Sequence, residues 1–238
     1  MKKILFVCLS LLASNFARGQ SAGSPALNPT VKIQEKVYKK ALENNDLEVA
    51  TVALYQLIAL QPENKSWEDS LCLLYHGRGY YLQSAKLAVE SIKRNPNSLA
   101  FRELFAQALE SLGNYKEAIE QYDYLYKVSK NAVFMYKTAT MLFALKRYEE
   151  SESLLNKIVL DPETKELTIS TQPDLNVNQM KNIPIRAAVL NLLGVIFMEQ
   201  KRTKEARKAF DEALVYYPAY ILVQQNIQQL KRGEQSVP

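Results

Sequence analysis

Cys72 and His76 are the pair in this sequence whose types and spacing could do chemistry. They stand four residues apart in a run with helical periodicity, so both side chains lie on one side of a helix. A thiolate and an imidazole can bind zinc, or can act as a nucleophile and its base. However, His76 is the single histidine of the chain, and the nearby acids Glu68 and Asp69 do not complete a recognisable ligand set. The sequence therefore predicts no metal site and no catalytic residues.

A repeat of about 34 residues organises most of the chain. Its anchor is a small side chain, found at Ala50, Ser84, Ala118, Ser151 and Ala206, with steps of 34, 34, 33 and 55 residues. The place twelve residues before each anchor is small in four of five copies: Tyr38, Cys72, Ala106, Ala139 and Gly194. Two facing small positions let antiparallel helices approach closely. Cys72 is accordingly interpreted as a compact, buried apolar residue.

The copy from Leu112 through Gly113, Asn114 and Tyr115 to Ala118 resembles the tetratricopeptide repeat, a helix–turn–helix unit of about 34 residues. The resemblance covers residues 31–62, 65–96, 99–130, 132–163 and 187–218. Departures from the family pattern are Asn45, Lys146 and Lys201 at a place that prefers glycine, Lys130 in place of a proline, and Thr138 at a usually apolar place.

The resemblance implies an all-α fold, a right-handed α-solenoid of five helix–turn–helix units. Residues 219–232 continue the helical periodicity and are predicted to form a C-terminal capping helix, followed by a tail over 233–238. Residues 165–186 interrupt the array and contain Pro173 and Pro184 beside the β-favouring segment 167–169. Such a long connection is uncommon in a compact array. We expect it to form a short hairpin or an irregular lobe on one edge.

The N-terminus has the pattern of a secretory signal peptide over residues 1–19. Lys2 and Lys3 precede an apolar run over 4–13, and small residues surround Arg18 before Gln20. The alternative is an uncleaved anchor, but a membrane span needs about 20 apolar residues. We expect an exported bacterial protein, periplasmic or envelope-associated, with a flexible lead-in over 20–30 and no integral membrane segment after cleavage.

Cleavage also changes the charge of the chain. It removes Lys2, Lys3 and Arg18 and no acid, which lowers the formal net charge from +5 to +2. The remaining basic residues alternate with acids along every repeat, so no continuous basic stripe is present for a phosphate backbone. Nucleic acid is therefore not a predicted partner. Cys72 is the one cysteine left, so no intramolecular disulfide is predicted.

In the tetratricopeptide repeat family the first helix of each pair lines a concave groove, at places 15, 11 and 8 residues before the anchor. These places share one helix face. We predict that a protein or peptide segment binds there, against Glu103, Gln107, Tyr136, Thr140, Phe143, Asn191, Val195 and Met198. In the alternative arrangement, the apolar members of this set pack beneath the 165–186 insertion.

The function predicted from these patterns is a non-catalytic protein–protein interaction module or scaffold of the cell envelope. The alternative is a small-ligand carrier or an enzyme with a site formed by the groove and the 165–186 insertion. One histidine, seven glycines and the lack of a phosphate-loop motif weigh against that alternative, and no cofactor is predicted. The sequence leaves the oligomeric state undecided, since the groove, the insertion or an edge could pair with a second copy.

Overall fold

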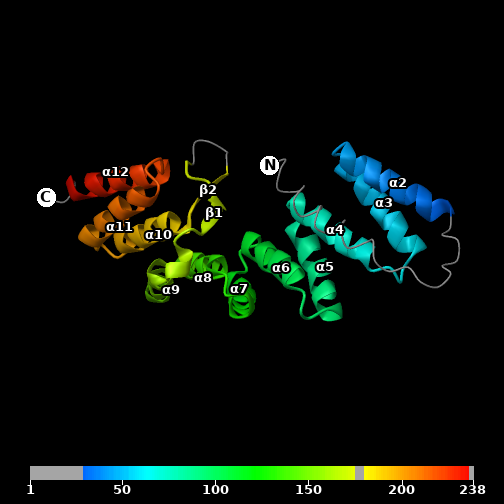
Figure 1. The fold of residues 1–238 in the computed structure, drawn as a ribbon, viewed down its shortest axis with the longest axis horizontal. Helices are drawn as coiled ribbons and strands as arrows, with labels where there is room; N and C mark the ends of the chain where they lie inside the picture. The colour runs from blue at the N-terminus through cyan, green and yellow to red at the C-terminus, as the bar shows by residue number, and fades with distance from the viewer. Residues whose placement is uncertain (1–28, 175–179, 236–238) are drawn as a thin grey trace. The chain divides into compact units, whose positions relative to one another are not determined.

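The structure is a computed structural model that describes residues 29–174 and 180–235. The predicted signal peptide and most of the predicted lead-in lie outside the described residues. The chain divides into two compact units, residues 1–108 and 109–238, with the boundary inside helix α6. Each unit is a stack of paired helices (Figure 1). The all-α prediction of helix–turn–helix repeats is confirmed.

Unit 1 contains four complete helices and most of a fifth. They are α2 (Pro29–Glu43), α3 (Leu47–Leu60), α4 (Ser66–Gly77), α5 (Tyr81–Arg94) and α6 (Leu99–Ser111). Helix α2 pairs with α3, and α4 pairs with α5. Trp67 of α4 is buried against Tyr38 of α2, with ring centroids 6.3 Å apart, and its indole nitrogen donates to Gln61 Oε1. Successive pairs in this unit therefore share an apolar core.

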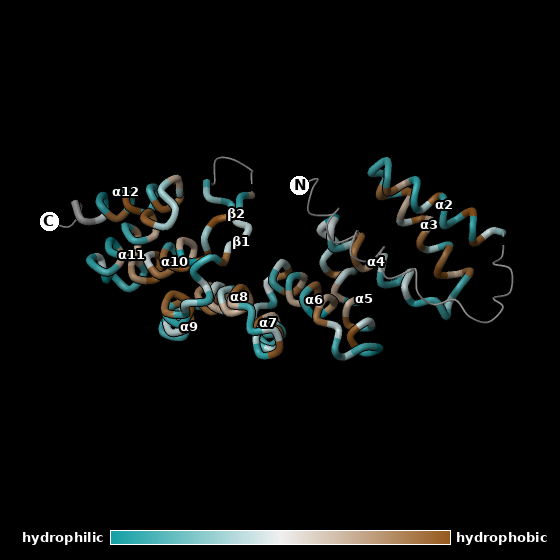
Figure 2. The backbone as a smooth tube through the Cα atoms, in the orientation of Figure 1, coloured by the Kyte–Doolittle hydropathy of each residue, from teal (hydrophilic) through white to brown (hydrophobic). Residues whose placement is uncertain are grey.

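Unit 2 contains the remaining pairs and the insertion. Its elements are α7 (Tyr115–Ser129), α8 (Ala132–Ala144), α9 (Tyr148–Leu160), the short 3₁₀ helix η2 (Pro162–Thr164), β1 (Thr168–Thr171), β2 (Lys181–Pro184), α10 (Ile185–Glu199), α11 (Thr203–Tyr216) and α12 (Ile221–Gln235). Figure 2 shows that α10 is much more hydrophobic than its partner α11. Helix α10 is accordingly the centre of the largest apolar core in this unit.

Every turn between the two helices of a repeat uses the left-handed backbone conformation at the same place, five residues before the anchor. The φ angles there are 56° at Asn45, 77° at Gly79, 76° at Gly113, 59° at Lys146 and 60° at Lys201. Glycine adopts this conformation without steric cost, whereas other residues pay about 1 kcal/mol or more. The three departures from glycine noted in the sequence therefore keep the turn geometry.

The small positions bring paired helices together as expected. Ser151 Oγ donates to Ala139 O at 2.8 Å, so α8 and α9 touch through side chain and backbone. The closest approach is at Gly194, where an added Cβ would lie 2.3 Å from Cε1 of Phe210. The ring of Phe210 thus fills the space that a side chain at Gly194 would need.

The insertion forms a two-stranded antiparallel hairpin, which was one of the two forms expected. Ile169 of β1 stands opposite Ile183 of β2, and both are buried in the core that contains α10. Beyond β1, Pro173 O accepts a hydrogen bond from Leu222 N at 2.9 Å, which ties the insertion to the start of α12. Figure 1 shows the hairpin beside α10.

Several predicted boundaries differ from the observed ones. Helix α2 already starts at Pro29, because proline is well tolerated in a first helical turn. Ile185 and Arg186 belong to α10 and not to the insertion. The capping helix starts at Ile221, since Tyr220 N closes a turn onto Tyr217 O, and it continues to Gln235 through Gly233. None of the described helices is both long and apolar enough to span a bilayer.

Candidate functional site

Cys72 is buried and His76 is half-buried in unit 1. Cys72 is fully buried, its Sγ donates to Ser84 O at 3.4 Å, and burial raises the pKa of its thiol to about 11. Such a thiol is protonated at neutral pH and is a poor nucleophile. Burial also lowers the pKa of His76, whose ring lies 5.6 Å from that of Tyr81. Within the described residues, no three His, Cys, Asp or Glu side chains gather to hold a metal ion.

The predicted partner-binding residues fall into both compact units and are described unit by unit. Glu103 and Gln107 lie on α6 in unit 1. Gln107 Nε2 donates to Glu103 Oε1 at 3.0 Å, and Gln107 also hydrogen-bonds to His76 of α4. The predicted face of α6 is therefore joined to α4 by a polar contact.

On α8, Tyr136, Thr140 and Phe143 are all half-buried. Thr140 Oγ1 donates to Lys137 O at 2.7 Å, and the ring of Phe143 lies 5.8 Å from that of Tyr148. Burial raises the pKa of Tyr136, and the hydroxyl of Tyr220 and the carboxylate of Glu110 raise it further. Tyr136 thus lies within electrostatic reach of the segment that precedes α12.

On α10, Asn191, Val195 and Met198 are also half-buried. Asn191 Oδ1 accepts a hydrogen bond from Asn226 Nδ2 of α12 at 2.9 Å. Val195 and Met198 pack on the core that includes the two hairpin isoleucines. Sequence reasoning missed the contact with Asn226, because it depends on where α12 packs. The six residues on α8 and α10 are called the repeat face of unit 2 from here on.

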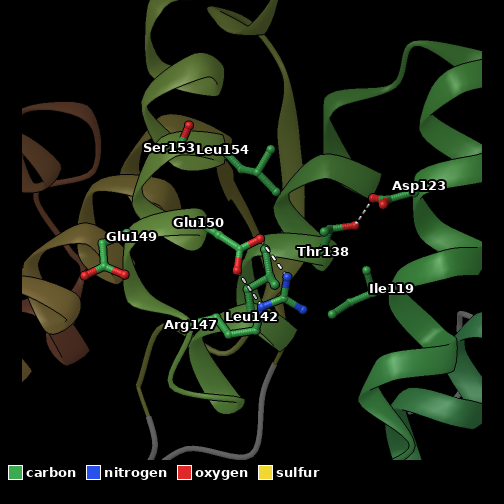
Figure 3. A pocket seen from close by; sticks show the side chains of 9 residues that line it. All are labelled: Ile119, Asp123, Thr138, Leu142, Arg147, Glu149, Glu150, Ser153 and Leu154. Atoms are coloured by element: carbon green, nitrogen blue, oxygen red, sulfur yellow. Dashed lines mark hydrogen bonds and ion pairs between the residues drawn. The ribbon is translucent and has the colours of Figure 1, made fainter.

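The structure also contains a cleft that the sequence did not predict as a site. It has a volume of about 430 Å³ and lies among α7, α8 and α9 (Figure 3); it is lined by Ile119, Asp123, Thr138, Leu142, Arg147, Glu149, Glu150, Ser153 and Leu154. Two residues along a helix correspond to about 200° of rotation. Thr138 and Leu142 therefore point away from the side of α8 that carries Tyr136 and Thr140.

Polar contacts cross and border this cleft. Thr138 is buried, and its hydroxyl donates to Asp123 Oδ1 at 2.9 Å from α8 to α7. Arg147 donates from Nε and Nη2 to the two carboxylate oxygens of Glu150, at 2.6 Å each. The one sequence signal for the cleft was Thr138 itself, a polar residue at a usually apolar place of the repeat.

Comparison with protein families identifies the chain. Two models described as tetratricopeptide repeat match it, one over residues 73–132 and 105–164 and the other over residues 187–220. Together they cover more than half of the sequence. The chain belongs to the tetratricopeptide repeat family.

Solved structures of the same class resemble it in fold. MamA from Desulfovibrio magneticus RS-1, residues 41 to the end, is 14% identical with a TM-score of 0.61, over 82% of this chain and 98% of that one. YrrB, described as a TPR protein with an unusual peptide-binding site, is 12% identical with a TM-score of 0.61, over 85% of this chain and 100% of that one. At such low identity the likeness shows the fold alone. The comparison with curated proteins gave no match.

The family supports a general functional class. Tetratricopeptide repeats generally form non-catalytic modules that bind proteins or peptides. The buried thiol of Cys72 and the half-buried apolar side chains of the repeat face agree with this class. The chain is therefore a protein-interaction scaffold in the general sense of its family.

Proposed function

We propose that this protein is a non-catalytic scaffold of the cell envelope that binds a segment of a partner protein on the repeat face of unit 2. The observation that carries the proposal is the partial exposure of Tyr136, Phe143, Val195 and Met198 at equivalent repeat places on α8 and α10. The description of YrrB as peptide-binding adds support from a protein of the same fold.

The energetics require several contacts at once. Complete burial of one large apolar side chain stabilises a complex by about 1.5–3 kcal/mol. Phe143 and Met198 are already half-buried, so each has only part of this energy left to give. A partner segment must therefore cover both helices of the repeat face. Loss of one central side chain should then weaken binding strongly.

The envelope location is proposed from residues 1–19, which have the charge pattern and apolar length of a signal peptide. Fractionation of cells followed by N-terminal sequencing tests this proposal directly. We expect the protein in the envelope or periplasmic fraction, with a sequence that starts at Gln20. Recovery from the cytoplasm with residues 1–19 still present would reject export.

Affinity capture from an envelope extract tests the binding face. The bait is the mature protein, residues 20–238, as wild type, Phe143→Glu and Met198→Glu. Val215→Glu is the matched control, since it adds the same charge at an apolar residue that is 80% exposed on α11. Circular dichroism and thermal melting show whether each variant is folded.

We expect a stoichiometric protein that is captured by the wild type and the Val215→Glu control, and lost with Phe143→Glu and Met198→Glu. Equal capture by all four proteins would reject the repeat face as the binding site. Native mass spectrometry of the purified protein adds a separate readout. A small molecule retained in stoichiometric amount would favour the ligand-carrier alternative.

A further inference from the structure

The cleft among α7, α8 and α9 lies at a departure from the repeat pattern. Thirteen residues before the anchor, the other four repeats carry large apolar side chains: Val37, Leu71, Phe105 and Leu193. The fourth repeat carries Thr138 there. Leu71 and Leu193 are buried and fill the space behind their helices. In the fourth repeat the shorter Thr138 lines the cleft between the second helices α7 and α9.

The walls of the cleft combine apolar surface with negative charge. Ile119, Leu142 and Leu154 supply aliphatic carbon from three different helices. Among the nine lining residues Arg147 is the one cation, and both of its hydrogen bonds go to Glu150. That ion pair is electrically balanced, so Asp123 and Glu149 leave the lining with a net negative charge.

The geometry gives a cation a defined place. Asp123 stands on the α7 wall and uses Oδ1 for the Thr138 hydroxyl, so its carboxylate is held in one orientation over the cleft (Figure 3). Lysine and arginine carry a long aliphatic stem below the charged group. Such a stem fits along Ile119 and Leu154 while the cation reaches Asp123.

We propose that this cleft is a second docking site, for a partner segment that carries a lysine or arginine next to an apolar side chain. Charge complementarity selects this occupant, because the cleft lining is net negative and includes three aliphatic side chains. The site lies on the opposite side of α8 from the repeat face and extends the proposed scaffold function to a second surface. It does not depend on binding at the repeat face.

Methyl NMR of the mature protein tests the proposal with two defined probes. One is a short synthetic peptide of alternating leucine and lysine, and the other has glutamate in place of lysine. We expect the lysine peptide to shift the methyl signals of Ile119, Leu142 and Leu154 and to leave those of Val195 unchanged. The glutamate peptide should leave all four unchanged.

Two variants make the test specific. Thr138→Leu places in the fourth repeat the residue that the second and fifth repeats carry at this place. The leucine side chain should fill the cleft and lower the affinity for the lysine peptide at least tenfold. Asp123→Asn is isosteric and keeps an acceptor for Thr138, so it remains informative if Thr138→Leu fails to fold. It should weaken binding about tenfold and reduce the dependence of affinity on salt.

Unchanged affinity in both variants, or equal shifts with the glutamate peptide, would overturn the proposal. Shifts confined to Val195 would overturn it too, because they would place the peptide on the repeat face. Phe143→Glu separates the two surfaces, since it should keep the lysine-peptide shifts at Ile119 and Leu154. The proposal for the cleft can therefore be rejected while the proposal for the repeat face is supported, and the reverse is also possible.

Discussion

Helices α8 and α10 hold equivalent places in successive repeats but are packed differently on the side away from the repeat face. In α10, Leu193 and Gly194 are buried, and Gly194 lies directly against the ring of Phe210. In α8, the equivalent pair is Thr138 and Ala139, and the Thr138 hydroxyl bonds to Asp123 beside an open cleft. The two helices thus differ at one place of the repeat, where α10 carries a buried leucine and α8 carries a threonine that lines the cleft.

The other side of the two helices also differs in what covers it. Asn191 of α10 is hydrogen-bonded to α12, and the hairpin isoleucines lie in the core around α10. Tyr136 of α8 interacts with Tyr220 and Glu110, which come from distant parts of unit 2. Helix α10 is therefore held on both sides, whereas α8 retains a cleft on one side. Substitutions on the closed side of α10 should therefore cost more stability than substitutions beside the cleft of α8.

The largest effect on the free energy of unfolding is expected on the closely packed side of α10 that faces away from the repeat face. Gly194→Ala puts a Cβ 2.3 Å from Cε1 of Phe210, and this ring is fully buried. Overpacking of this kind costs about 1–3 kcal/mol, and the short distance places Gly194→Ala at the upper end. We expect a loss of about 2–3 kcal/mol in the free energy of unfolding, measured by urea denaturation.

A second substitution provides the control for Gly194→Ala. Phe210→Leu removes the ring edge, so the double variant should regain part of the stability lost by Gly194→Ala. The two effects should be clearly non-additive, because the two residues are in contact. Wild-type stability in Gly194→Ala alone would show that the two helices are not held together as closely as described.

A smaller effect on the free energy of unfolding is expected on the side of α8 that borders the cleft. Asp123→Ala removes the acceptor of the buried Thr138 hydroxyl, and an unpaired buried polar group costs about 1–3 kcal/mol. Because the adjacent cleft admits water, we expect a loss of about 1 kcal/mol in urea denaturation. Thr138→Val should cost less, since half-buried Asp123 can turn to solvent. The reverse order of the two losses would contradict the hydrogen bond as described.

The smallest effect is expected where α12 meets α10. Asn226→Ala removes the hydrogen bond to Asn191 Oδ1, which joins two partly buried amides. A neutral hydrogen bond contributes about 0.5–1.5 kcal/mol, and partial exposure favours the lower end. Thermal melting should show a small decrease relative to Gln228→Ala, an exposed residue on the same helix. Identical melting of the two variants would mean that this bond adds nothing to the attachment of α12.

Much of the fold was predictable because the repeat encodes its own geometry locally. The small anchor residues and the turn positions predicted paired helices, and the family comparison confirmed the tetratricopeptide repeat. Binding on the repeat face is still a prediction. Glu103 and Gln107 also fall in a different compact unit from the other six predicted residues.

The sequence by itself determined the repeat phase, the positive φ at places such as Lys146, and the close approach at Gly194, because each depends on residues within one helix pair. Three features were decided by the tertiary structure alone. They are the hydrogen bond between Asn191 and Asn226, the burial of Ile169 in the core around α10, and the cleft that Thr138 lines. These features join segments from different repeats. Their geometry follows from how whole helices stack, and a local pattern of residue types does not specify it.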